Sequence, residues 1–242
     1  MCRDRRGGAG HRGDRHGRCG WSGPRHGGRR GLAARSGDRW TLPLVRELLL
    51  GSHRFNDIHR GLPGISRTLL SARLRRLQGI GLVTRMADAD GRPEYRLTQA
   101  GAALEPLIWQ LGDWARRWHF GDPRPEQLDT GWVLWRLRQF VRTEYLPAQR
   151  VSIEFILDDP SGAEEHGWLV LARHDVSACL RHPGYDTDLW VTTELGELHR
   201  LVAGTSSLDD AFRTGRFRIH GEPGLVAGFS SWFDWRTTIS DA

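Results

Sequence analysis

Several residue types that often carry chemistry are scarce or missing in this 242-residue chain. It has no lysine, and its three cysteines, Cys2, Cys19 and Cys179, form no Cys-x-x-Cys pair. Disulfides and a cysteine-based zinc site are therefore not expected. No apolar run approaches the roughly 18 residues of a membrane-spanning helix, and no signal peptide precedes the folded segments. We therefore expect a cytoplasmic protein without a membrane span.

The signatures of common enzyme classes are also missing. The chain has no Gly-x-Ser-x-Gly, no P-loop, no His-Glu-x-x-His and no Gly-x-Gly-x-x-Gly after a strand. His166, His174 and His182 lie in loop-like sequence, where no helical turn places a cysteine or carboxylate beside them. We expect no cofactor, no metal and no enzymatic activity. An enzyme acting on a bound lipid is the least supported alternative.

Charge is distributed unevenly along the chain. Residues 1–39 hold 11 arginines against three aspartates, residues 40–120 hold 12 arginines against seven acids, and residues 121–242 hold 12 arginines against 19 acids. A basic first half and an acidic second half predict that only the first half approaches a polyanion. Residues 1–36, rich in arginine, glycine and histidine, cannot bury enough apolar surface to fold, so we expect a disordered basic arm. It either contacts phosphates nonspecifically or is a mis-assigned start of the reading frame.

After Trp40 the pattern changes to helices followed by a hairpin. Apolar periodicity, Gly51 as a stop signal and an Asp90-Gly91 turn predict three helices and two strands. Their expected ranges are 40–51, 53–62, 66–81, 82–86 and 93–98. This is the order of a winged helix-turn-helix, whose third helix fits the major groove of DNA.

The third helix carries the candidate DNA contacts. Ser66 is a plausible N-cap, and Leu70, Leu74 and Leu77 share one face, which turns the opposite face outward. Arginine pairs with guanine edges or phosphates, and serine and threonine bond either. We expect DNA contacts from this outward face. On the wing, Asp88 and Asp90 should repel phosphate. Any wing contact is therefore expected from Arg92, with Arg85 as a weaker candidate. The helix residues concerned are Arg67, Thr68, Ser71 and Arg75.

The chain resembles the HxlR family over residues 37–118. The resemblance rests on RELLLG-x-x-RF-x-D-I, LPGIS-x-x-LLS-x-RL-x-x-L, GLV-x-R and Y-x-LT-x-x-G in the family's order and spacing. It implies a winged-helix dimer that binds operator DNA. The first helix of the family is shortened here, and Cys19 lies in glycine-rich sequence, so the family's cysteine-based redox sensing is not carried over.

A long helix over residues 99–118 follows the hairpin and carries more apolar surface than its own domain can cover. Trp114 and Trp118 are candidate contacts with a second copy of the chain. Packing within one subunit is the alternative.

The second half alternates between strand and helix patterns. A helix is expected over residues 129–147, and alternation of Val151, Ile153 and Phe155 with polar residues begins a run of strands. Further strands and helices end in a helix over 222–233. This order predicts an α+β fold.

The second half resembles sterol-carrier-protein-like domains in WLVL, PGYD-x-DL-x-V and SL-x-DA-x-R-x-GR-x-R-x-x-G. The resemblance implies a mixed sheet covered by helices, with an apolar cavity for lipids or acyl chains. Large apolar residues that could line it are Phe155, Trp168, Trp190, Phe217, Phe229 and Trp232, although such residues are more often plain core. A filled cavity that leaves the domain only to stabilise a dimer is also open.

Four segments result: a disordered arm (1–36), a winged-helix domain (37–120), a linker with a connecting helix (121–146) and a sterol-carrier-like domain (147–237). Together they predict a homodimeric transcriptional regulator of double-stranded DNA that responds to a lipid or other hydrophobic small molecule. The alternative is a lipid-binding or carrier protein whose winged helix mediates protein contacts. The arginines of the third helix favour the regulator.

Overall fold

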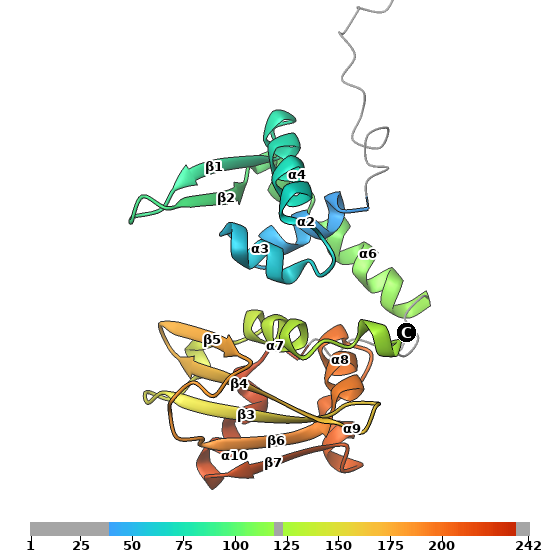
Figure 1. Ribbon diagram of the computed structural model, residues 1–242, viewed down its shortest axis with the longest axis vertical. Helices are drawn as coiled ribbons and strands as arrows, with labels where there is room; N and C mark the ends of the chain where they lie inside the picture. The colour runs from blue at the N-terminus through green and yellow to red at the C-terminus, as the bar shows by residue number, and fades with distance from the viewer. Residues whose placement is uncertain (1–38, 119–122, 236–242) are drawn as a thin grey trace, which may run out of the picture. The chain divides into compact units, whose positions relative to one another are not determined.

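A computed structural model describes residues 39–118 and 123–235. The basic arm predicted for residues 1–36 lies outside the described residues. The first elements are α2 (Thr41–Leu49), α3 (Phe55–Gly61) and α4 (Arg67–Gly79), followed by the antiparallel hairpin of β1 (Val83–Ala87) and β2 (Pro93–Leu97) (Figure 1). This is the winged-helix arrangement that the sequence predicts.

The winged helix is held by an aliphatic core. Gly51 takes a positive φ of 86°, which lets the chain leave α2 without strain. The backbone N–H of Tyr95 donates to the carbonyl of His53 at 2.8 Å and so fixes β2 to the loop before α3. The buried side chains of this core are Leu44, Val45, Leu48, Ile58, Leu62, Ile65, Leu70, Leu74, Leu77, Leu82, Val83 and Ile108.

The single helix predicted for residues 99–118 is wrong, because the structure has two. The chain forms α5 (Gln99–Ala102) and then α6 (Glu105–Trp118). Pro106 has no backbone N–H to continue the α5 ladder, but a proline is tolerated in the first turn of a new helix. In α6 only Ile108 is buried, and four large apolar residues are between 45% and 65% exposed: Leu107, Leu111, Trp114 and Trp118.

The connecting helix is also shorter than predicted. The 3-10 turn η1 (Pro125–Gln127) leads into α7 (Thr130–Gln139), which ends well before residue 147, and η2 (Thr143–Tyr145) follows. After Gln139 the chain pairs with a distant segment: Val141 bridges Phe233, and the Arg142 N–H donates to the carbonyl of Trp232 at 2.7 Å. These long-range bonds replace the helical ones.

A five-stranded mixed sheet forms the second half, as predicted. Its strands are β3 (Val151–Asp158), β4 (Glu164–Ala172), β5 (Asp175–Cys179), β6 (Leu189–Glu194) and β7 (Phe217–Gly221). They lie in the order β5-β4-β3-β6-β7, and only the β3–β6 pair is parallel.

Helices pack on one face of this sheet (Figure 1). They are α7, α8 (Leu195–Ala203), α9 (Leu208–Arg213), α10 (Pro223–Gly228) and the 3-10 turn η3 (Phe229–Trp232), the last two replacing the single helix predicted for 222–233. Alternate residues of β3 point into the shared core. The second half is therefore α+β, with one helical layer.

A buried ion pair joins α2 to α7. The Nη2 of Arg136 donates to Oε1 of Glu47 at 2.6 Å, and the two side chains are 5% and 0% exposed. Beside it, Gln139 donates to the Ser52 hydroxyl at 2.8 Å. In residues 39–118 and 123–235 no helix is both long and apolar enough to cross a membrane.

Candidate nucleic-acid interface

The outward face of α4 is the first part of the candidate interface. The Ser66 hydroxyl accepts the backbone N–H of Leu69 at 3.2 Å and caps the helix as predicted. The three predicted leucines are buried, which fixes how α4 is rotated about its axis. The opposite face is therefore in solvent: Arg67, Thr68 and Arg75 are exposed and Ser71 is half-buried.

Arg67 is held in place by α3. Its Nη2 donates to Oδ1 of Asn56 at 2.6 Å, and its guanidinium lies 5.3 Å from the centre of the Phe55 ring. A guanidinium held by a hydrogen bond and an aromatic ring loses less conformational freedom when it binds a base or phosphate. Asn56 and Phe55 are therefore supporting residues that the sequence pattern did not reveal.

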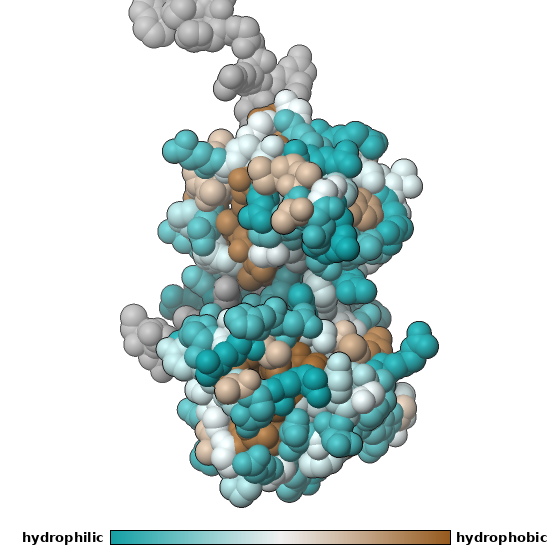
Figure 2. All heavy atoms as spheres, turned by 90° about the vertical axis from the view of Figure 1, so that its left-hand side faces the viewer, coloured by the Kyte–Doolittle hydropathy of each residue, from teal (hydrophilic) through white to brown (hydrophobic). Residues whose placement is uncertain are grey.

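The wing supplies the second part. Arg92 is 63% exposed and its Nη1 lies 3.5 Å from Oδ2 of Asp90. Arg85 is exposed on β1, and β1 buries only Val83. The hairpin projects beyond the helices (Figure 1), and the side toward which it points is mainly hydrophilic, with apolar residues gathered in a few patches (Figure 2).

Asp88 does not behave as the free, phosphate-repelling charge that the sequence suggested. Its Oδ2 accepts a hydrogen bond from Arg54 at 2.7 Å. Its Oδ1 accepts the backbone N–H groups of Asp90 at 2.9 Å and Arg92 at 2.8 Å. The Arg92 N–H is the chief reason that the pKa of Asp88 lies below its usual value, with Asp90 and Arg54 adding to it against a desolvation cost.

The imidazole of His53 adds no positive charge to this surface at neutral pH. Burial lowers its pKa, and the nearby Arg96 lowers it further, against the opposing effects of Glu94 and Asp57. The positively charged candidates on this surface are the arginines Arg67, Arg75, Arg85 and Arg92.

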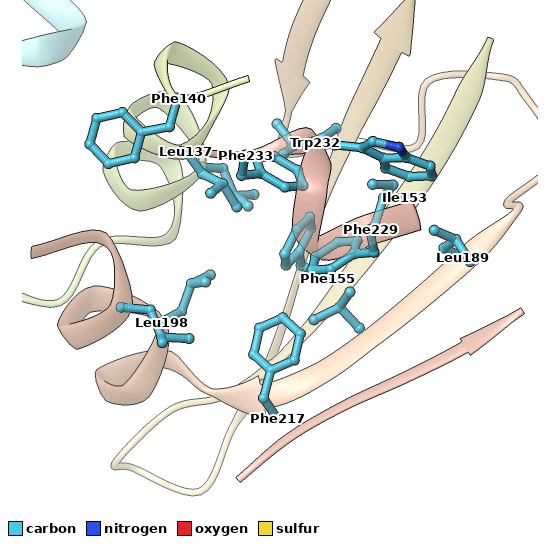
Figure 3. Close-up of a cluster of buried hydrophobic side chains, with 14 of the residues drawn as sticks. Leu137, Phe140, Ile153, Phe155, Leu189, Leu198, Phe217, Phe229, Trp232 and Phe233 are labelled. Atoms are coloured by element: carbon cyan, nitrogen blue, oxygen red, sulfur yellow. The ribbon is translucent and has the colours of Figure 1, made fainter. Parts of the chain in front are cut away.

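The six residues predicted to hold a hydrophobic ligand do not form one site. Phe155, Phe217, Phe229 and Trp232 are buried in the core between sheet and helices. Three of the four rings lie close together: the Phe217 and Phe229 centroids are 5.8 Å apart, and those of Phe229 and Trp232 are 6.3 Å apart (Figure 3).

Trp168 and Trp190 lie on the opposite face of the same sheet. Glu154 pairs with both in register, and the neighbours Ile153 and Phe155 point into the core, so residue 154 and its partners point away from it. Trp168 is covered by His166 and His182, whereas Trp190 is 38% exposed. A ligand that touched the four core residues could not touch these two as well.

In the part of the chain that the structure describes, no three histidine, cysteine, aspartate or glutamate side chains come together in a way that could hold a metal ion. His166 instead contacts the carboxylates of Glu154 at 2.9 Å and Glu164 at 3.0 Å. Cys179 is a half-buried free thiol on β5, less buried than its apolar surroundings in the sequence suggested.

Comparison with known proteins identifies relatives of the first half of the chain. A family model described as HxlR-like helix-turn-helix matches residues 36–122. YvaP of Bacillus subtilis, an uncharacterised HTH-type transcriptional regulator, is 40% identical over 82 residues, which are 33% of this chain and 76% of YvaP. Rv3095 of Mycobacterium tuberculosis, described in the same words, is 44% identical over 92 residues, 37% of this chain and 56% of Rv3095.

The chain thus spans little more than half of the mycobacterial relative. Among solved structures, one from Thermoplasma volcanium described as a possible HxlR family transcriptional factor is 31% identical. The match covers 36% of this chain and 83% of that one, with a TM-score of 0.30.

Proposed function

Since the chain belongs to the HxlR-like helix-turn-helix family of transcriptional regulators, we propose that it binds double-stranded DNA through α4 and the wing. The observation that carries this proposal is the outward face of α4. Three buried leucines set the rotation of the helix, and that rotation presents Arg67, Thr68 and Arg75 to solvent. Arginine at these positions supplies both guanine recognition and phosphate contact.

The test is selection of the full chain against a randomised duplex library, followed by affinity measurements over a salt series. A DNA-binding regulator enriches a defined sequence, and its log affinity falls linearly with log salt, with a slope of about −0.9 per phosphate contact. No enriched sequence and no salt-dependent retention would remove the proposal. The same result would favour the carrier alternative, in which the winged helix contacts protein.

We also propose that the chain acts as a symmetric dimer joined along α6. Leu107, Leu111, Trp114 and Trp118 recur every three or four residues on one helical face, and all are largely exposed. A second copy of the same stripe is the occupant that matches it chemically, and two-fold symmetry lets one apolar stripe cover the other. Such a dimer would read a pseudo-palindromic operator with half-sites about one helical turn apart or a multiple of it.

A third proposal is that the second half is a sterol-carrier-like domain that senses a hydrophobic small molecule. The mixed sheet with one helical layer supports the resemblance to a sterol-carrier-like domain. The Glu47–Arg136 pair supports a role in sensing, because it gives α7 a direct bond to the winged helix. Since Phe229 and Trp232 fill the core, a ligand would have to displace the α10–η3 segment that carries them.

Sensing is tested by operator affinity with and without fatty acids, acyl-CoAs and sterols. A ligand shifts DNA affinity only as far as it binds the DNA-competent and the DNA-incompetent states with different affinity. A typical coupling free energy of roughly 1–3 kcal/mol would change the operator affinity about 5- to 150-fold. If none of the molecules that the chain binds shifts affinity, the sensor proposal fails and the DNA-binding proposal stands.

A further inference from the structure

The turn of the wing is closed by one carboxylate. Besides the two backbone N–H groups that Asp88 accepts, the main-chain N–H of Asp88 donates to the carbonyl of Arg92 at 2.8 Å. Gly91 takes the positive φ of 76° that the turn requires. The backbone around Asp90 and Arg92 therefore depends on the side chain of Asp88.

The same carboxylate is bonded to the helical part of the domain. Arg54, the residue before α3, donates from Nη2 to Oδ2 of Asp88 across 34 positions of sequence, and its Nε lies 4.0 Å from Oε1 of Glu94. Glu94 also accepts two bonds from Arg96, at 2.9 Å and 3.2 Å. Asp88 and Glu94 are thus each held by hydrogen-bonded arginines, whereas Asp90 has only the longer 3.5 Å contact with Arg92.

Apolar packing holds the wing at its base only. Val83 of β1 belongs to the core, and the half-buried Tyr95 and Leu97 of β2 pack against it, whereas the other four residues of β1 are exposed. The described bonds from the wing to the segment before α3 are the backbone bond between Tyr95 and His53 and the side-chain contacts of Arg54. A hairpin without such bonds would lose conformational entropy on docking against DNA, which would weaken binding.

We propose that Arg54 and Asp88 form a positioning pair that fixes the wing beside α4 in the orientation that binds DNA. This inference rests on the proposed DNA-binding function. It reverses the simple electrostatic expectation, because removing an acid from a DNA-facing surface ordinarily strengthens binding. Asp88 strengthens binding as an organiser of the turn, whereas its neighbour Asp90, 66% exposed, weakens it as a charge.

The experiment compares Asp88→Ala with the matched control Asp90→Asn in the full chain, using the duplex that wild type selects from a randomised library. We expect Asp88→Ala to bind roughly 10-fold more weakly, the equivalent of one lost arginine–phosphate contact, with a shallower salt slope. Asp90→Asn should bind equally or about 2- to 3-fold more tightly. Asp90→Asn should keep the thermal midpoint of wild type, whereas Asp88→Ala should lower it only slightly, because the bonds that it removes lie in an exposed turn and not in the core.

Arg54 is tested through a double-mutant cycle, since this exposed arginine could also touch phosphate itself. If it acts through Asp88, Arg54→Ala and Asp88→Ala together weaken binding no more than the worse of the two alone. Amide exchange of residues 90 and 92 should accelerate in both single variants.

Two results would overturn the pair. One is Asp88→Ala binding as tightly as wild type or Asp90→Asn; the other is additive losses in the cycle. Failure of wild type itself to select or retain any duplex would instead remove the proposed function, so the two failures are distinguishable.

Discussion

The two hydrophobic cores of this chain are built from different side chains. Every buried apolar residue of the winged-helix core is leucine, isoleucine or valine. The core of the second half adds Phe155, Phe217, Phe229, Trp232 and Phe233, whose rings gather between sheet and helices (Figure 3). The first core is aliphatic, and the candidate functional arginines of that region lie outside it, on the surface. In the second region the large aromatic side chains lie inside the core.

The two cores therefore suggest different places for a binding site: the surface of the winged helix, but the interior of the second half. In the winged helix the residues proposed to contact DNA are already exposed on α4. In the second half a ligand would have to enter a space that packed rings occupy, at the cost of the contacts they make. The predictions below test whether the two regions differ in this way.

Phe229→Ala should have the largest effect. The ring is fully buried against Phe217, Trp232 and Phe233, so its removal should lower the free energy of unfolding by about 3–5 kcal/mol. Denaturant unfolding measures this loss of free energy. The control is Trp190→Ala, on the exposed face of the sheet, which should lower the free energy of unfolding far less. Equal costs for both variants would mean that the aromatic cluster is not a packed core.

Arg136→Ala should be nearly as damaging, because it leaves the Glu47 carboxylate buried without its main partner. Breaking a buried pair typically costs about 3–5 kcal/mol, and Gln139, 3.4 Å from the same carboxylate, should keep the loss near the lower end. The control is the double variant Glu47→Leu/Arg136→Met, which removes both charges and should recover most of the stability. If the double variant recovers no stability, the loss in Arg136→Ala does not come from the unpaired charge of Glu47 alone.

Arg67→Ala and Arg75→Ala should each weaken operator binding by about 1–3 kcal/mol without unfolding the protein. A base-contacting arginine should also relax sequence preference at one position. The matched control is Arg213→Ala, an exposed arginine of the second half that pairs with Asp210. If both α4 variants bind like Arg213→Ala, α4 is not the recognition helix.

Leu111→Glu tests the stripe on α6, where a charge in the centre of an apolar contact should weaken self-association at least 10-fold, or about 1.4 kcal/mol. Sedimentation at micromolar protein concentration measures the fraction of dimer in each variant. Thr84→Glu, an exposed site on β1, serves as the control. Wild type that is monomeric with and without DNA would contradict the dimer.

The smallest expected effect is on pH dependence. Burial lowers the pKa of His199 against the opposing charge of the nearby Asp129 carboxylate, and the Asp129 N–H donates to Nε2 of the ring, so the folded protein holds the imidazole neutral. The unfolded chain binds a proton more readily, so stability is fully present above about pH 6.5 and declines as pH falls below it. His199→Gln should make the unfolding free energy fall less steeply between pH 7.5 and 5.5, and the part that remains is expected from the lowered pKa of His53.

Local signals explain what the sequence predicted well. Ser66 followed by leucines at helical spacing specifies both the start of α4 and its buried face, because caps and periodicity involve residues a few positions apart. The alternation of β3 and the Asp90-Gly91 turn are local in the same way. The candidate residues on α4 could therefore be named from the sequence.

Long-range bonds explain what the sequence did not predict. The end of α7 depends on Phe233 and Trp232, more than 90 positions away. The partner of Asp88 is Arg54, and the partner of Arg67 is Asn56, pairs that no spacing rule brings together. The same limit applies to the ligand residues, since only the register of the sheet separates Trp168 and Trp190 from the four aromatic residues of the core.

Hydrogen–deuterium exchange of the full chain, with and without its selected duplex, tests the central claim most directly. The account predicts that DNA slows exchange in residues 66–79 and in the wing, 83–97, and leaves the strands β3 to β7 unchanged. Protection concentrated in the second half, or no protection in α4 under conditions where the duplex is bound, would contradict it.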